Sequence, residues 1–181
     1  VTAKQFDSAV AVLKSKIPLL AENEIRVEFI RLVAMFKIGH SSVYFYTGEN
    51  EESPKSMFHF YPFTISPFSD GLYIQQIDST YKEALGGRLI KIGNDAVDLA
   101  LKKLHDVIPC ENEQFFKNNL HYFIRLPEIL EVLKITPNAD AVVLTYIKNG
   151  TESKIEIKAE DCPEYAWNDG IYLPKGWVDA Y

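Results

Sequence analysis

The chain has 181 residues, of which 47% are hydrophobic and 24% charged, and its formal net charge at pH 7 is −6. A chain of this length and composition can bury a core of its own, whereas nucleic acid is not expected as a partner because phosphate binding requires clustered lysine and arginine. No apolar run approaches the ~20 residues that a membrane-spanning helix requires, so no membrane-spanning segment is predicted.

Two amphipathic helices are predicted at the N-terminal end. The first begins at Thr2, which can form a capping box with Gln5, and it ends before Pro18. The second begins near Asn23 and is expected to end at Gly39. Because only a few residues connect them, the two helices are expected to pack antiparallel. The apolar face of the second helix consists of Ile25, Phe29, Leu32 and Phe36.

A β-hairpin is predicted after these helices. Apolar residues alternate at Val43 and Phe45 and again at Phe58 and Phe60. The polar residues 48–56 between them favour a turn. The helices and the hairpin form the first predicted region, residues 1–61.

The second predicted region covers residues 62–160 and combines strands with helices. The stretch "DGLYIQQID" alternates as a strand does, and the Asn149-Gly150 pair predicts a tight turn between two closing strands. A helix from about Ala96 has one apolar face. Between these signals we expect a strand at residues 88–92 and two further helices at residues 111–123 and 126–133. The chain is therefore expected to have an α+β fold.

Residues 161–181 are rich in aromatic residues, glycine and proline, and their periodicity is weak. Such a segment either lies across the preceding region or leads into another one.

The order strand, short helix, "GGRLIKIGNDAV" and closing hairpin resembles a PDZ-type domain of the bacterial kind, a partly open β-barrel, in which "GLYI" would be the peptide-binding strand. The helical segment at about residues 111–134 is then an insertion, similar to the one in the tricorn-like, tail-specific (C-terminal-processing) serine peptidases. In those proteins a helical N-terminal region ends in a "DGHT" or "SHT" motif, which "IGHSS" at residues 38–42 matches by position and partly by letter. The resemblance covers about residues 6–158.

The resemblance implies that this chain is the N-terminal, substrate-binding and regulatory portion of a serine-type peptidase. The nucleophilic serine would belong to a C-terminal catalytic domain of the same polypeptide, toward which residues 161–181 would be a linker, and no cofactor is implied. No Gly-x-Ser-x-Gly elbow occurs in this sequence, so the chain alone is not expected to catalyse hydrolysis. The resemblance also implies a periplasmic or extracellular location.

His40 is the candidate general base, since it follows a predicted helix end and precedes a strand, where a neighbouring domain could bring the serine. The alternative is that His40 caps helix carbonyl groups or is simply solvated. His59 alternates with two phenylalanines and is interpreted as structural.

A peptide or protein segment is the expected partner of the PDZ-like region. It would add as an extra strand beside residues 71–77, with side-chain pockets against the helix after Ala96. Because Asp70 would repel a terminal carboxylate, we expect an internal segment there, or a groove filled by the protein's own chain. The candidate peptide-binding residues are Gly71, Leu72, Tyr73, Ile74, Gln75, Val97, Leu101 and His105.

Two alternatives remain open. The same groove could serve a non-catalytic PDZ-like scaffold module that binds a peptide or protein partner. Cys110 and Cys162 could form a disulfide or remain two thiols. No metal site is predicted, since His105, Cys110 and His121 match no ligand spacing.

Overall fold

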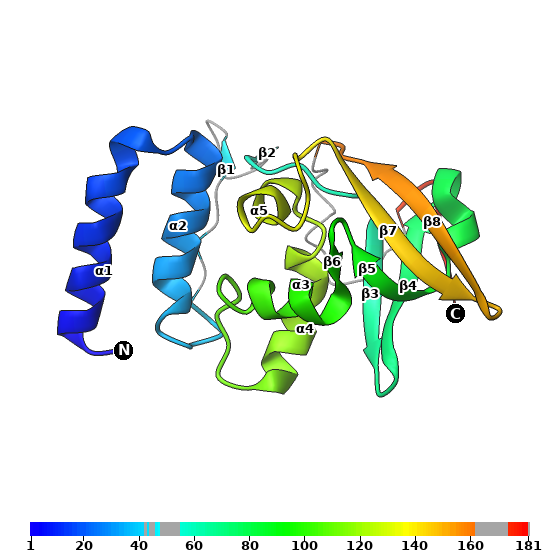
Figure 1. The fold of residues 1–181 in the computed structure, drawn as a ribbon, viewed down its shortest axis with the longest axis horizontal. Helices are drawn as coiled ribbons and strands as arrows, with labels where there is room; N and C mark the ends of the chain where they lie inside the picture. Colours follow the sequence, from blue (N-terminus) through cyan, green and yellow to red (C-terminus); the bar gives the residue numbers. More distant parts are fainter. Residues whose placement is uncertain (42, 44–45, 48–54, 162–173, 181) are drawn as a thin grey trace.

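The computed structural model describes the whole chain except residues 42, 44–45, 48–54, 162–173 and 181. The fold is mixed α+β, as expected: the α-helices occupy one side of the molecule and an antiparallel sheet the other (Figure 1). None of the helices in the described part of the chain is long and apolar enough to cross a membrane.

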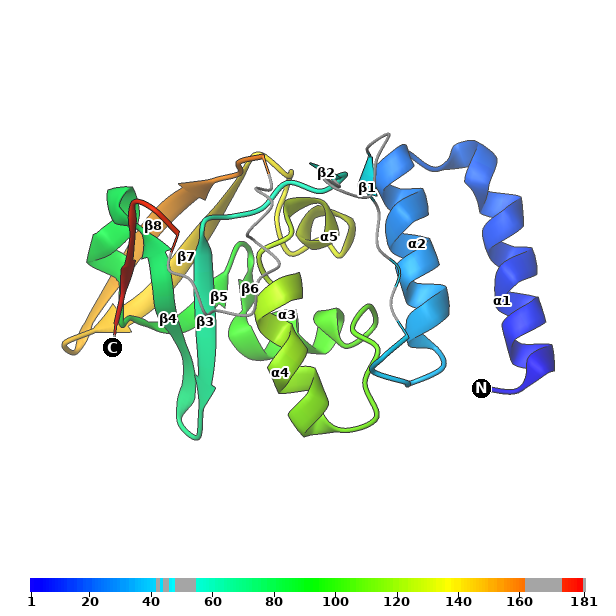
Figure 2. The same cartoon turned by 180° about the vertical axis from the view of Figure 1, so that it is seen from behind.

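The N-terminal helices form the predicted antiparallel pair (Figures 1 and 2). Helix α1 (Ala3–Lys16) begins at the predicted capping box, in which the Gln5 N–H donates to Thr2 Oγ1 (3.3 Å) and the Thr2 N–H donates to Gln5 Oε1 (2.8 Å). A 3₁₀ turn, η1 (Ile17–Leu19), leads to α2 (Glu22–Ala34). Helix α1 packs against α2 and lies outermost in the molecule (Figure 1).

Helix α2 has two apolar faces, and the sequence pattern identified the less buried one. Phe29 and Phe36 are 43% and 41% exposed, and the Phe36 ring packs on Phe6 of α1 with centroids 5.0 Å apart. The opposite face packs against α5 and belongs to the main core. Helix α2 lies between α1 and α5 and buries residues against both, so a single apolar stripe does not describe it. Its buried residues are Val27, Ile30 and Ala34.

The expected end of α2 at Gly39 is wrong. The helix ends at Ala34, and Lys37 takes the left-handed conformation (φ 52°) while its N–H donates to the Ala34 carbonyl (3.0 Å). Gly39 is buried, and a Cβ atom there would lie 2.1 Å from a ring carbon of Phe115. Glycine is needed at residue 39 for close approach rather than for ending the helix.

The predicted N-terminal hairpin exists but is shorter and shifted. Strands β1 (Tyr46–Thr47) and β2 (Lys55–Ser56) pair antiparallel as a separate small sheet. Phe58 lies outside a strand, and Phe60 forms an isolated bridge with Glu160. Phe45 and most of the predicted turn lie outside the described residues.

The main sheet is antiparallel and has seven strands among the described residues, with the central order β3-β4-β5-β7-β8. Two short strands complete it, since β6 pairs with β5 and β9 pairs with β4. The strands are β3 (Phe63–Phe68), β4 (Gly71–Asp78), β5 (Arg88–Ile92), β6 (Asp95–Ala96), β7 (Ala141–Lys148), β8 (Thr151–Lys158) and β9 (Trp177–Asp179).

The remaining helices lie close to where the sequence predicts them, and they are η2 (Ser79–Ala84), α3 (Val97–Leu104), α4 (Glu113–Phe123) and α5 (Pro127–Val132). The predicted turn between β7 and β8 is confirmed, because Asn149 and Gly150 both have positive φ (51° and 77°) and Lys148 pairs with Thr151. Two consecutive positive φ values are what a tight type I′ hairpin turn requires.

The prediction of a linker at residues 161–181 is wrong for its last part. Strand β9 pairs with β4 in the main sheet, and the Trp177 ring stacks on Phe60 with centroids 6.3 Å apart. This part of the chain therefore returns to the sheet, which adds an unpredicted seventh strand beside β4.

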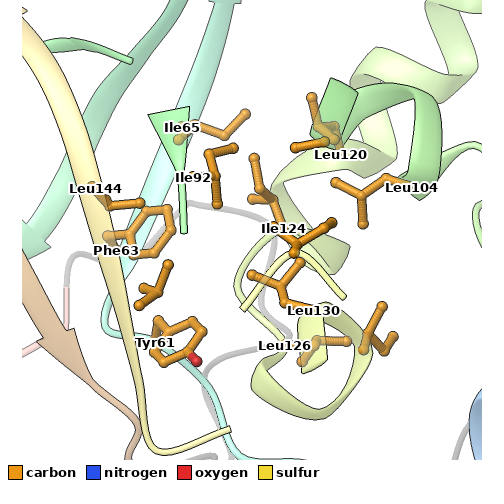
Figure 3. Packing of buried hydrophobic residues seen from close by; sticks show 14 of the residues in the cluster. Tyr61, Phe63, Ile65, Ile92, Leu104, Leu120, Ile124, Leu126, Leu130 and Leu144 are labelled. Atoms are coloured by element: carbon orange, nitrogen blue, oxygen red, sulfur yellow. The ribbon is translucent and has the colours of Figure 1, made fainter. Parts of the chain in front are cut away.

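One continuous core joins the sheet to the helices. Figure 3 shows Phe63 and Leu144 of the sheet on one side and Leu104, Leu120 and Leu130 of the helices on the other. The same cluster includes Val27 and Ile30 of α2. Residues from both predicted regions thus share one core.

Candidate functional site

His40 lies in an exposed turn between α2 and β1. The Ser41 N–H donates to the Ile38 carbonyl (2.9 Å), which closes this turn. The imidazole meets the Phe115 ring of α4 edge-on, with centroids 5.6 Å apart and planes at 72°. Because Phe115 also fills the space beside Gly39, one ring supports both the backbone and the side chain of the turn. His40 is therefore held at a defined place on the surface.

A general base in acyl transfer needs a serine hydroxyl within hydrogen-bond reach and a group that orients its ring. Within the described residues, no hydrogen bond or ion pair reaches the His40 imidazole, and its ring contact is to Phe115. The described part of the chain thus supplies an exposed imidazole and the Phe115 ring that packs against it.

His59 has a structural environment, in keeping with its interpretation from the sequence. Its Nδ1 lies 2.6 Å from Glu128 Oε1, and its main-chain N–H donates to both oxygens of the same carboxylate (3.1 and 3.2 Å). The Glu128 side chain is only 4% exposed, whereas that of His59 is 54% exposed. Burial first, and then the negative charge of Glu128, raises the pKa of Tyr61 far above its usual value. This contact fastens residues 58–61 to α5.

Strand β4 contains the predicted peptide-binding residues 71–75, but it lies inside the sheet. Strand β3 pairs with one of its edges from end to end. On its other edge, Ile74 exchanges hydrogen bonds with Gly86 and Gly87 of the β5 approach, and β9 pairs from Gln76 onward. A peptide cannot add as a strand beside β4 in this arrangement, so the predicted position is wrong. Leu72 and Ile74 are core residues, with exposed fractions of 6% and 0%.

The predicted second wall of the groove, α3, packs mainly against β5 and β6. Val97 and Leu101 pack on the core from this helix. Lys103 Nζ lies 2.6 Å from a carboxylate oxygen of the buried Asp95 and donates to the Lys134 carbonyl (2.9 Å). These contacts tie α3 to β6 and to the chain just after α5, so α3 and β4 do not form the expected pair of walls.

The segment around Asp70, where a terminal carboxylate is expected to be repelled, is a tight turn. Phe68 pairs with Gly71, which leaves two residues between β3 and β4. The Tyr73 hydroxyl donates to Asp70 Oδ2 (2.6 Å). The Asp70 carboxylate therefore has a partner within its own hairpin.

Strands β3 and β8 stand at the two ends of the central strand order, and the outer edge of β3 is one of the two that strand addition could use. Ile65 lies directly opposite Ile74, whose main-chain groups point toward β5. Since antiparallel partners share their direction of hydrogen bonding, the N–H and C=O of Ile65 point away from β4. Pro67 follows in the same orientation and has no N–H, as is typical of edge strands. Helix α4 contacts β3 and lies beside it (Figures 1 and 2).

His105 contacts Cys110 and Glu113 instead of a β4 groove. Its Nδ1 is 4.0 Å from Cys110 Sγ, and its Nε2 is 3.3 Å from Glu113 Oε1. The sequence-based predictions do not include this cluster, because they give His105 a peptide contact and find no metal-ligand spacing; the signal for it is a histidine, a cysteine and a glutamate around one helix start. Among the described residues, no group of three or more His, Cys, Asp and Glu side chains could hold a metal ion.

A scan against protein-family models finds no match for this chain, and a search of curated proteins likewise finds none.

Proposed function

We propose that this chain is the N-terminal, substrate-binding portion of a tricorn-like, tail-specific serine peptidase, with a PDZ-like arrangement in residues 62–160. His40 is the general base, and the nucleophilic serine belongs to a C-terminal catalytic domain of the same polypeptide. In the reaction, His40 takes the serine proton while the hydroxyl attacks a peptide carbonyl. The peptide C–N bond then breaks as His40 gives this proton to the leaving amine, and water later hydrolyses the acyl-enzyme. The proposal includes a periplasmic or extracellular location, which rests on the resemblance to this peptidase family alone.

The observation that carries this proposal is the environment of His40. An imidazole that serves a serine from another domain must be exposed, and its position must be set by its own domain. His40 is exposed, and Phe115 packs against both its ring and the buried Gly39. A histidine that only capped helix carbonyls would be expected to contact the end of α2, whereas α2 ends six residues earlier, at Ala34.

Substrate binding in this proposal uses the outer edge of β3. The main-chain groups of Ile65 and the carbonyl of Pro67 supply the hydrogen bonds for one added strand. Because Pro67 lacks an N–H, the pairing is short, which suits a segment that must move on to a catalytic centre. The side chain of Ile65 is 3% exposed, so the bound segment meets the main chain of β3 at this position rather than a deep pocket.

Covalent labelling tests the enzymatic part. The protein is produced with the residues that its gene encodes after Tyr181 and treated with a fluorophosphonate that reacts with activated serines. We expect labelling in the unaltered protein and at least about a 10²-fold slower reaction in His40→Ala, the usual contribution of a general base. The matched control is His121→Ala, which removes a histidine from α4 and should leave the labelling rate unchanged.

Equal labelling of His40→Ala and the unaltered protein would remove His40 from the mechanism. Absence of labelling in every form would favour the second candidate function, a non-catalytic PDZ-like module that binds a peptide or protein. The observation that favours this alternative is the same β3 edge. A peptide-array screen with the 181-residue chain then tests this module, because peptide binding by a protein that the fluorophosphonate does not label in any form would support it.

A further inference from the structure

Three chemically complementary side chains meet where α3 ends and α4 begins. His105 is the residue that caps the C-terminal end of α3, Cys110 lies in the connection, and Glu113 is the first residue of α4. His105 Nδ1 is 4.0 Å from Cys110 Sγ, and His105 Nε2 is 3.3 Å from Glu113 Oε1. Both the thiol and the imidazole are partly exposed, so a small molecule from solvent can reach them.

The surroundings select one form of the imidazole. A carboxylate accepts hydrogen bonds, so Glu113 favours the tautomer with its proton on Nε2. The lone pair of Nδ1 then faces the Cys110 thiol. The Phe116 ring stacks on the imidazole with centroids 3.6 Å apart and planes at 9°, which keeps the ring in this orientation. A nucleophile, a base and a group that orients the base are thereby placed in series.

The charges around the thiol are mostly negative. Burial raises the pKa of the Cys110 thiol, the charges of Glu113 and Glu111 raise it further, and Lys37 opposes them. Cys110 is therefore protonated at neutral pH and needs a local base to react. The same two carboxylates repel anionic reagents and attract cationic ones.

We propose that Cys110 is a modification site whose thiol is deprotonated by His105 and exchanges with neutral or cationic disulfides. The Cys110 proton moves to His105 Nδ1 while Sγ attacks one sulfur of the reagent disulfide. The reagent S–S bond breaks, a mixed disulfide forms on Cys110, and the leaving thiolate takes the proton from the imidazolium. One disulfide is consumed and one is formed, so the reagent is the oxidant.

The charge preference is tested on the unaltered 181-residue chain. The chain is incubated at pH 7 with cystamine, a dicationic disulfide, or with dithiodiglycolate, a dianionic one. Mass spectrometry of the peptide that contains Cys110 reports its modification separately from Cys162. After each rate is divided by that of N-acetylcysteine amide, we expect cystamine to react about tenfold or more faster than dithiodiglycolate. Equal normalised rates would overturn the proposal.

The role of the base is tested with two variants that change different properties. His105→Gln removes the base and should slow the cystamine reaction about tenfold at pH 7, with the difference disappearing at alkaline pH where the thiol ionises unaided. Glu111→Gln removes one negative charge without touching His105, so it should speed the dithiodiglycolate reaction and leave the effect of His105 intact. Far-UV circular dichroism establishes that both variants are folded. A His105→Gln protein that reacts as fast as the unaltered chain would show that the imidazole takes no part.

Discussion

At the scale of single residues, Gly39 and Phe115 determine how His40 is presented. The ring of Phe115 lies where a Cβ atom of residue 39 would be, and its edge meets the His40 imidazole. The contact joins the turn after α2 to α4, two segments far apart in the sequence. Support for the exposed histidine therefore comes from α4 and not from α2, the helix that precedes it.

Gly39→Ala is expected to destabilise the protein by about 1 to 3 kcal/mol, because the added methyl group overpacks a filled site. Its Cβ would lie 2.1 Å from the Phe115 ring, so the ring or the turn must move. Urea denaturation measures the change. In the Phe115→Leu background the same substitution should cost markedly less, and equal costs in the two backgrounds would mean that this contact is not the cause.

At the scale of elements, several local signals in the sequence predicted the structure correctly, whereas the pairing of distant segments could not be predicted. The Asn149-Gly150 turn and the Thr2 capping box depend on neighbouring residues, and both are present in the structure. The inner position of β4 depends on β3 and β9, and β9 lies about 100 residues away in the sequence. Alternation along one strand cannot reveal which strands flank it.

In the candidate site, too, a local feature could be predicted from the sequence and contacts between distant segments could not. The exposure of His40 after a helix could be expected from the sequence, because a turn between a helix and a strand lies on the surface. Its support by Phe115 could not, since this contact arises only when α4 folds back against the turn. The meeting of His105 with Glu113 likewise depends on how the connection between α3 and α4 folds.

Helix α2 offers a direct test of two-sided packing. Val27 is fully buried against the main core, whereas Phe29 is 43% exposed. Val27→Ala should therefore destabilise the protein by about 2 kcal/mol, and Phe29→Ala by about 1 kcal/mol or less despite the larger side chain removed. Chemical denaturation of both variants provides the comparison. A larger loss of stability for Phe29→Ala would indicate that the face of α2 that carries Phe29, which the sequence pattern identified, contributes more to stability than the face that carries Val27.

At the scale of the whole molecule, residues 58–61 join the N-terminal helices to the sheet. Phe60 and Glu160 exchange two main-chain hydrogen bonds, of 3.0 and 2.9 Å. Phe60 also stacks on Trp177, and the Tyr61 N–H donates to the Arg125 carbonyl (2.8 Å). This short segment thus contacts the connection between α4 and α5, the chain just after β8, and β9.

Glu160, which is hydrogen-bonded to Phe60, is expected to make the stability of the protein depend on pH. Burial, and then the charge of Asp78, raises the pKa of Glu160 above its ordinary value of 4.5. The folded state consequently binds more protons than the unfolded state between the two pKa values, and this contribution to stability is lost as pH rises through that range. Glu160→Gln should be more stable than the unaltered protein at pH 7, by less than about 1 kcal/mol because residue 160 is exposed.

Urea denaturation at pH 4 and pH 7 measures this effect. The stabilisation by Glu160→Gln should be smaller at pH 4, where the native carboxyl is protonated. Glu156→Gln, an exposed substitution on β8, is the matched control and should show no such trend. The same stabilisation by Glu160→Gln at both pH values would contradict the assignment.

The burial of Gly39 also bears on how such a sequence can change over evolutionary time. A side chain at residue 39 fits this turn without displacing the ring or the turn only after the aromatic ring at residue 115 has become smaller. Substitutions at these two positions are consequently expected to occur together in related sequences, with the change at 115 preceding the change at 39. The histidine next to them would keep its surface position only along that ordered route.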